Sequence, residues 1–189
     1  MSMRRWASAG GLALLLAASG AIAATTPTRD QWEMPFRESA PVGERGEGRN
    51  IAGTVHSARL ADAVRDDTWQ SGVGSLWLVV DAGMESVSDV GVLAHATVVV
   101  GERTFSASER PHADTMRRAG LEPGIATRGV LVFELPADIL GDPDAAAAEL
   151  QLALDLDTRL DSVLVTPIDL TALERSPVDV IVDRRWGRG

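Results

Sequence analysis

Residues 92–106 read VLAHATVVVGERTFS and carry the clearest structural signal in the chain. Apolar side chains recur at every second position up to Val100, which is typical of a half-buried β-strand. Gly101-Glu102 suits a two-residue type II′ turn, whose first residue has a positive φ and is usually glycine. Because Thr104 to Ser106 can form the returning arm, this stretch predicts a β-hairpin.

Similar patterns lie on both sides of this hairpin. The leucines within residues 150–156 alternate with polar or small residues, and residues 76–80 are apolar throughout, as in a central strand. Further strands are expected at residues 51–60, 130–135 and 162–170. About six to eight short strands with turn signals between them favour an all-β, antiparallel β-sandwich. The expected core residues are Leu76, Leu78, Val98, Val132, Phe133, Leu152 and Leu154.

The N-terminus has the pattern of an export segment. Arg4 and Arg5 precede an apolar run of 17 residues from Trp6 to Ile22, which small residues follow. Residues 1–23 are therefore either a signal peptide, cleaved between Ala23 and Ala24, or a signal anchor that stays in the membrane. Both alternatives place the rest of the chain outside the cytoplasm, either secreted or anchored to the cell membrane. The paired arginines leave Sec and twin-arginine export both open.

Mass spectrometry of the native protein separates these alternatives. Cleavage is expected to leave Ala24 as the first residue, because Ala21 and Ala23 supply the small side chains that a signal peptidase requires. An intact Met1 in the membrane fraction would instead establish the anchor.

The remaining chain divides by composition into three parts. Residues 24–49 contain three prolines and a glycine-rich run with little apolar periodicity, so they are expected to be a flexible linker. Residues 50–172 hold the predicted strands of the sandwich. Residues 173–189 are expected to be a C-terminal tail.

Composition narrows the possible functions. The chain has 189 residues, a net charge of −9 and no cysteine, so neither a disulfide nor a thiolate nucleophile is available. It has no lysine either, which excludes a Schiff base. Its acidity argues against nucleic acid or anionic lipid as the main partner.

No pattern of catalytic or metal-binding residues emerges. His56, His95 and His112 are far apart and lack the spacing of a zinc site. The acids at positions 155, 157 and 161 lack the glycine of an EF-hand loop, and Asp155 and Asp157 are expected on the outward face of a strand. We therefore expect a protein without catalytic residues, metal or cofactor.

The longest irregular stretch, residues 108–128, is the expected interaction loop, because binding residues concentrate on loops that a rigid scaffold holds. A short helical turn is expected within it at residues 114–119. The candidate partner-binding residues are Arg110, His112, Arg117 and Arg118, of which the adjacent arginines suit bidentate contact with carboxylate or phosphate groups.

The order of these segments resembles a known family. The strand GSLWLVVD at residues 74–81, an aromatic residue at Phe105, LEPG at residues 121–124 and GVLVFELP at residues 129–136 are its landmarks. Over residues 50–170 the chain is similar to a bacterial immunoglobulin-like domain of unknown function found on secreted antigens and surface lipoproteins. The resemblance implies an immunoglobulin-like sandwich outside the cell and brings no catalytic residues. The lipoprotein cysteine that this family often carries is absent here.

These observations together predict an exported, non-catalytic interaction or adhesion module of the cell envelope. Its expected partner is an envelope protein or wall polymer, not nucleic acid, and membrane contact is expected only through residues 1–23 if they are uncleaved. The alternative is an extracytoplasmic protein that binds a small molecule or metal ion, with a hydrolase less favoured.

Overall fold

The computed structural model describes residue 19, residues 34–72 and residues 74–186. The chain divides into two compact units, residues 1–34 and residues 35–189. Nearly all of the first unit, including the pair Ala23-Ala24 and the apolar run except Ser19, lies outside the described residues. No helix in the described part is long and apolar enough to cross a membrane.

The described part of the second unit is built from strands, with three short 3-10 helices. The elements follow one another along the chain as β1 (Phe36–Ser39), β2 (Arg45–Glu47), β3 (Ile51–Ala61), β4 (Val64–Arg65), β5 (Ser75–Ser86), β6 (Gly91–Val92), β7 (His95–Val100), β8 (Arg103–Ser106), β9 (Gly120–Leu121), β10 (Thr127–Pro136), η1 (Ile139–Gly141), η2 (Ala145–Ala147), β11 (Ala148–Ala153), β12 (Ser162–Ile168), η3 (Leu170–Ala172), β13 (Arg175–Ser176), β14 (Asp179–Val180) and β15 (Arg185–Trp186).

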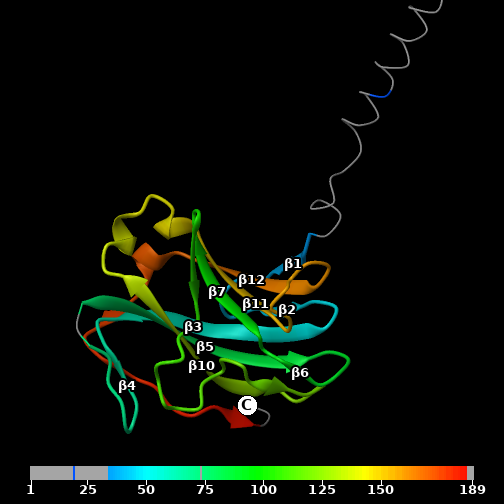
Figure 1. The fold of residues 1–189 in the computed structure, drawn as a ribbon, viewed down its shortest axis with the longest axis horizontal. Coiled ribbons are helices and arrows are strands. Elements are labelled where there is room, and N and C mark those ends of the chain that lie inside the picture. Colours follow the sequence, from blue (N-terminus) through cyan, green and yellow to red (C-terminus); the bar gives the residue numbers. More distant parts are fainter. Residues whose placement is uncertain (1–18, 20–33, 73, 187–189) are drawn as a thin grey trace, which may run out of the picture. The chain divides into compact units, whose positions relative to one another are not determined.

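Two sheets stack face to face, which confirms the predicted β-sandwich (Figure 1). The first, which we call the β12 sheet, has the strand order β1-β12-β11-β7-β8. The second, the β5 sheet, has the order β13-β3-β5-β10-β15, with β2 also paired to β3. Two small sheets, β14-β4 and β6-β9, flank them.

The predicted hairpin is confirmed in detail. Val100 pairs with Arg103 across a two-residue turn. Gly101 has φ +56°, whereas Glu102 is not among the described residues with positive φ, as a type II′ turn requires. The local sequence therefore sets both the turn and the register.

The main core lies between the two sheets. Of the expected core residues, Leu76, Leu78, Val98, Phe133 and Leu152 are buried there, and Leu154 is half-buried against them. Val132 is buried too, but in a second cluster on the opposite face of the β5 sheet. Strands β5 and β10 are thus apolar on both faces because both faces are covered.

The structure differs from the predicted linker and tail. Within residues 24–49, β1 pairs with β12 and β2 pairs with β3. Within residues 173–189, β13, β14 and β15 pair with β3, β4 and β10. These short edge strands are held mainly by backbone hydrogen bonds, so their sequences carry no apolar alternation. Three of the pairings, β1-β12, β13-β3 and β14-β4, are parallel, so the sandwich is antiparallel only in its principal strands.

Two local predictions are also wrong. Residues 114–119 form no helix; Arg118 lies in a turn with φ +55°. Strand β11 ends at Ala153, so Asp155 and Asp157 lie in a loop and not on a strand. Asp157 forms an ion pair there with Arg159.

Candidate functional site

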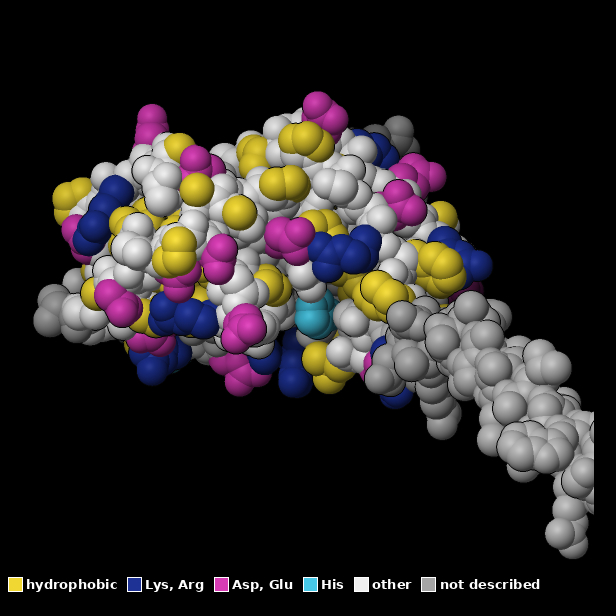
Figure 2. Space-filling model, turned by 90° about the horizontal axis from the view of Figure 1, so that it is seen from above, with side chains coloured by type: hydrophobic (Ala, Val, Ile, Leu, Met, Phe, Trp, Pro, Cys, Tyr) yellow, Lys and Arg dark blue, Asp and Glu magenta, His cyan; other side chains and the backbone are white. Residues whose placement is uncertain are grey.

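The outer face of the β12 sheet carries a mixed surface. Viewed from this side, acidic and basic side chains are interspersed with apolar ones (Figure 2). The pair Arg37 and Glu149 joins β1 to β11 across this face. Charges mixed in this way favour solubility over a single-sign binding patch.

The outer face of the β5 sheet is different, because three segments cover it. They are residues 62–72, residues 107–119 and residues 177–186, far apart in the sequence. Trp77 and Val132 lie beneath them in the second apolar cluster, together with Ile181 from the last segment. Trp69 packs edge-on against Trp77, with ring centroids 6.1 Å apart and an angle of 77° between the planes.

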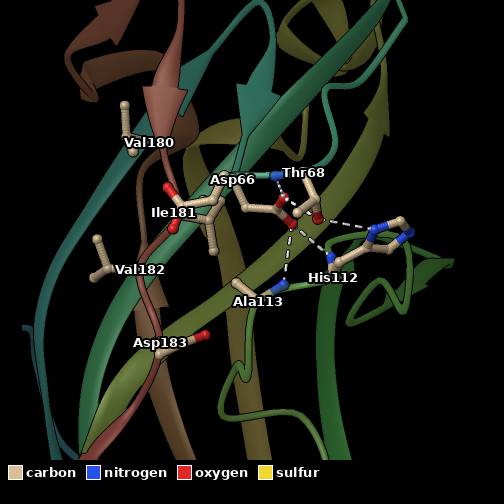
Figure 3. A pocket seen from close by; sticks show the side chains of 9 residues that line it. Asp66, Thr68, His112, Ala113, Val180, Ile181, Val182 and Asp183 are labelled. Carbon is tan, nitrogen blue, oxygen red and sulfur yellow. Dashed lines mark hydrogen bonds between the residues drawn. The ribbon is translucent and has the colours of Figure 1, made fainter.

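A pocket of about 290 Å³ lies where these three segments meet (Figure 3). It is open to solvent and combines acidic side chains with valines. The lining residues are Asp66, Asp67, Thr68, His112, Ala113, Val180, Ile181, Val182 and Asp183. We call this the three-segment pocket.

Asp66 ties two of the segments together. Its carboxylate accepts the backbone N–H groups of Thr68 and Trp69 in its own loop. The same carboxylate accepts the N–H groups of His112 at 2.6 Å and Ala113 at 3.0 Å (Figure 3). Partial burial raises the pKa of Asp66, but these four donors outweigh it and lower the pKa to about 2. The carboxylate is therefore ionised at neutral pH and fixes the pocket wall.

The C-terminal segment forms the third wall. Its strand β14 pairs with β4, and the N–H of Ile181 donates to the carbonyl oxygen of Arg65. Ile181 points inward and is 3% exposed, whereas Val180 and Val182 are exposed at the rim. The carboxylate of Asp183 accepts the N–H of Asp114, which joins this segment to the second one.

The polar groups in the pocket do not form a nucleophile-activating arrangement. The Thr68 hydroxyl lies between two groups: it donates to the Asp66 carboxylate at 3.2 Å and is 3.1 Å from His112 Nδ1. A catalytic triad needs the histidine between the hydroxyl and the carboxylate. Here the hydroxyl meets a carboxylate with a pKa of about 2, which is a weak base.

Of the predicted partner-binding residues, only His112 lines the pocket. Arg110 forms an ion pair with Glu134. Arg117 forms one with Glu109 and also donates to the carbonyl oxygen of Ala107 at 2.9 Å, so its guanidinium holds its own loop. Arg118 is exposed, and no side-chain partner is found for it among the described residues. The structure therefore does not present the two arginines as a joint clamp.

The other residues of the three-segment pocket were not predicted from the sequence. Asp66-Asp67-Thr68 does carry a local signal, since an aspartate often accepts the N–H two residues later. Nothing in the sequence, however, indicates that residues 180–183 reach this loop. Their placement depends on the packing of Ile181 over the β5 sheet.

The described residues contain no group of three or more histidine, aspartate or glutamate side chains that could hold a metal ion. His95 is on β7 and pairs with Ala153 of β11, and its partial burial there lowers its pKa. The His56 ring lies against Gly83. The three histidines are thus separated in space as they are in the sequence.

Acid is expected to weaken the fold between about pH 4 and pH 2. Asp66 and Asp157 have pKa values lowered to about 2, Asp157 mainly by its hydrogen bonds from Arg159. The ordinary value in an unfolded chain is about 3.9. Their contribution to stability is therefore fully present above about pH 4 and is lost as the pH falls through 2. Melting temperatures measured from pH 5 to pH 2 test this. Asp66→Asn should have a lower melting temperature than the wild type at pH 7, and its melting temperature should fall less as the pH is lowered. Parallel plots of melting temperature against pH for the variant and the wild type would contradict the role of Asp66.

Comparison with known proteins identifies no family. No protein-family model matches the chain, and no curated protein matches it. A similar solved structure is the crystal structure of an uncharacterized β-sandwich protein from Clostridium difficile 630. It shares 11% sequence identity, covers 76% of this chain and 99% of its own, and superposes with a TM-score of 0.48.

Proposed function

We propose that this chain is an exported, non-catalytic interaction module of the cell envelope and that the rim of the three-segment pocket is its binding surface. The observation that carries the proposal is the way Asp66 and Asp183 fix the three segments around exposed Val180 and Val182. A surface held in place before binding loses little conformational freedom when a partner docks. The pattern of residues 1–23 supports the proposal of export.

The partner is an envelope protein or wall polymer that brings a cationic group beside an apolar one. Asp67 is exposed at the rim, and Asp183 lies next to the exposed valines. The whole chain has a net charge of −9, which favours approach of a cationic surface. Valines beside carboxylates suit a basic side chain whose aliphatic stem packs while its charge is paired.

The strand order supports an immunoglobulin-like topology for this module. In such domains the sheet A-B-E packs against G-F-C, and some members add C′ beside C. The principal strands follow that order here if β3, β5 and β10 are A, B and E, and β12, β11, β7 and β8 are G, F, C and C′. The loops of such sandwiches commonly carry the binding residues.

A non-catalytic role fits the chemistry of the pocket. The Thr68 hydroxyl is directed at an acidic carboxylate, and the chain contains neither cysteine nor lysine as an alternative nucleophile. The hydrogen bonds of Asp66 and Thr68 hold loops together instead.

A second candidate is a binder of a small cationic molecule. The volume of about 290 Å³ is close to the lower end of typical ligand pockets, about 300 Å³, and the lining is acidic. An organic amine could pair with Asp67 and Asp183 while it contacts Val182.

A photo-crosslinking experiment distinguishes the two functions. A photoreactive amino acid at Val182 should give one defined adduct with a protein or polymer in envelope extracts. The same group at Glu102, in the β7–β8 turn, is the matched control and should not. A stoichiometric small ligand found by thermal shift, with no adduct at Val182, would favour the second candidate.

Charge reversal at the rim is expected to weaken partner binding. Asp67→Arg should reduce the binding free energy by more than about 1 kcal/mol if the rim is the contact. Its melting temperature should change little, because exposed substitutions usually alter stability by no more than about 0.5 kcal/mol. Binding is measured by calorimetry with the purified partner that the crosslinking experiment identifies.

Arg118→Glu is the matched control for that variant, because it reverses an exposed charge outside the pocket lining. Arg117 is left intact because it holds its own loop. Weaker binding by Arg118→Glu together with normal binding by Asp67→Arg would move the surface to the loop of residues 108–128.

A further inference from the structure

Apart from the pocket rim, exposed apolar side chains gather at one end of the sandwich. They come from three connections, β5–β6, β9–β10 and β11–β12, and from the short strands β1 and β6. We call this set the apolar end: Phe36, Val87, Val90, Val92, Ile125, Leu156 and Leu160.

Hydrogen bonds place these segments together. The N–H of Val87 donates to the carbonyl oxygen of Asn50, and the Asn50 side chain donates to Asp161 at 2.5 Å. The N–H of Phe36 donates to the carbonyl oxygen of Asp161 at 2.8 Å, next to Leu160.

Two further contacts bring in the other loops. Ser86 bridges to Pro123, near Ile125. Gly91 lies against the side chain of Leu154, two residues before Leu156. The loops of both sheets therefore meet at this end.

The tips of these loops hold large apolar side chains out to water. Val90 is 75% exposed, Leu156 69% and Leu160 56%. Leu160 also has φ +61°, a left-handed conformation that aliphatic residues rarely adopt. A strained backbone that holds a leucine outward is a feature to be explained by function.

The chain itself indicates what this end faces. The first strand of the sandwich begins at this end, because Phe36 is the first residue of β1 and lies beside Asp161, and in the sequence the apolar run of residues 6–22 precedes it. Residues 23–35, even if fully extended, span at most about 45 Å. If residues 6–22 remain in the bilayer, the apolar end is the part of the sandwich tied closest to it.

We propose that the apolar end is a lipid-contacting surface, whose loop tips enter the headgroup region of the membrane that holds the N-terminal segment. The proposal adds a membrane contact made by the sandwich itself, beyond the partner-binding function. It takes residues 1–23 as a signal anchor. Attachment at the same end raises the local concentration of the loops at the membrane, so shallow insertion of a few aliphatic side chains suffices.

The charges at this end select the kind of lipid. Asp89, Glu122 and Asp155 are exposed there and repel anionic headgroups. Arg49 stacks on the Phe36 ring, 4.3 Å from its centroid, where it can meet a lipid phosphate. We therefore expect contact with zwitterionic lipid, and weaker contact as anionic lipid is added.

The absence of cysteine allows a clean test with the full chain. Single cysteines at Val90, at Leu156 and at Glu102 are labelled with an environment-sensitive fluorophore, and each protein is reconstituted in phosphatidylcholine vesicles. Glu102 is the control, because the β7–β8 turn is at the opposite end of β7 from His95, which pairs with Ala153. The labels at Val90 and Leu156 should shift to the blue and be quenched by spin-labelled lipid, whereas the label at Glu102 should do neither.

A charged variant makes the test specific to the surface. Val90→Asp combined with Leu160→Asp should abolish the shift of the label at Leu156, while the N-terminal segment keeps the protein on the vesicles. The proposal is overturned if the labels at Val90 and Leu156 stay unshifted in vesicles. It is also overturned if they shift without lipid as the protein concentration rises, because that result would identify a second copy as the occupant. Neither outcome bears on crosslinking at Val182, which tests the partner-binding function separately.

Discussion

Replacing Phe133 by alanine is expected to lower the free energy of unfolding by about 3–5 kcal/mol. The Phe133 side chain is 0% exposed and lies in the core between the sheets. Its strand neighbour on β5 is Leu78, which is equally buried. Truncation leaves a cavity that closely packed strands cannot collapse to fill. Urea denaturation followed by circular dichroism measures the loss.

Phe36→Ala is the matched control, because it removes the same side chain from an exposed position on β1. Its effect should be no more than about 0.5 kcal/mol. If Phe133→Ala were as mild as Phe36→Ala, the β10 side chains would not form the core, and the sandwich packing described here would fail.

The strands that pack in the core could be predicted from the sequence. The alternation in β7 and β11 and the continuous apolar runs in β5 and β10 follow from burial on one face or on both. The β1 strand could not, because all four of its side chains are exposed and it is held by backbone pairing with β12. Backbone N–H and C=O groups are the same in almost every residue type, so pairing through them produces no sequence pattern.

The candidate site was only partly predictable for a related reason. His112 stands in an irregular loop with several charged residues, the loop that the sequence predicts for interaction, and it lines the three-segment pocket. Arg117, by contrast, forms an internal ion pair that sequence reasoning had no means to foresee. The valines at positions 180 and 182 lie in a stretch that reads as a tail, yet Ile181 between them docks on the outer face of the β5 sheet. Residues brought together only by this packing cannot be found from spacing.

Replacing Trp77 by alanine should loosen the three-segment pocket as well as destabilise the fold. Trp77 is 1% exposed and lies beneath the covering segments, in contact with Trp69. We expect a loss of about 3–5 kcal/mol, as for other buried aromatic side chains. Because Ile181 packs in the same apolar cluster as Trp77, the backbone amides of the C-terminal segment should also lose protection from hydrogen exchange.

Hydrogen exchange separates this variant from Phe133→Ala. In conditions where both variants remain folded, the amides of residues 179–183 should exchange faster with solvent in Trp77→Ala. Without the indole, local opening of this segment breaks fewer apolar contacts and costs less free energy. Phe133→Ala should leave those amides closer to the wild-type rate, since its cavity lies on the other face of the β5 sheet. Trp77→Phe keeps an aromatic ring in place and should restore most of the protection. Equal exchange rates at residues 179–183 in Trp77→Ala and in the wild type would show that the covering segments do not depend on this side chain. The hydrogen bonds of Asp66 and Asp183 would then have to hold the pocket walls alone.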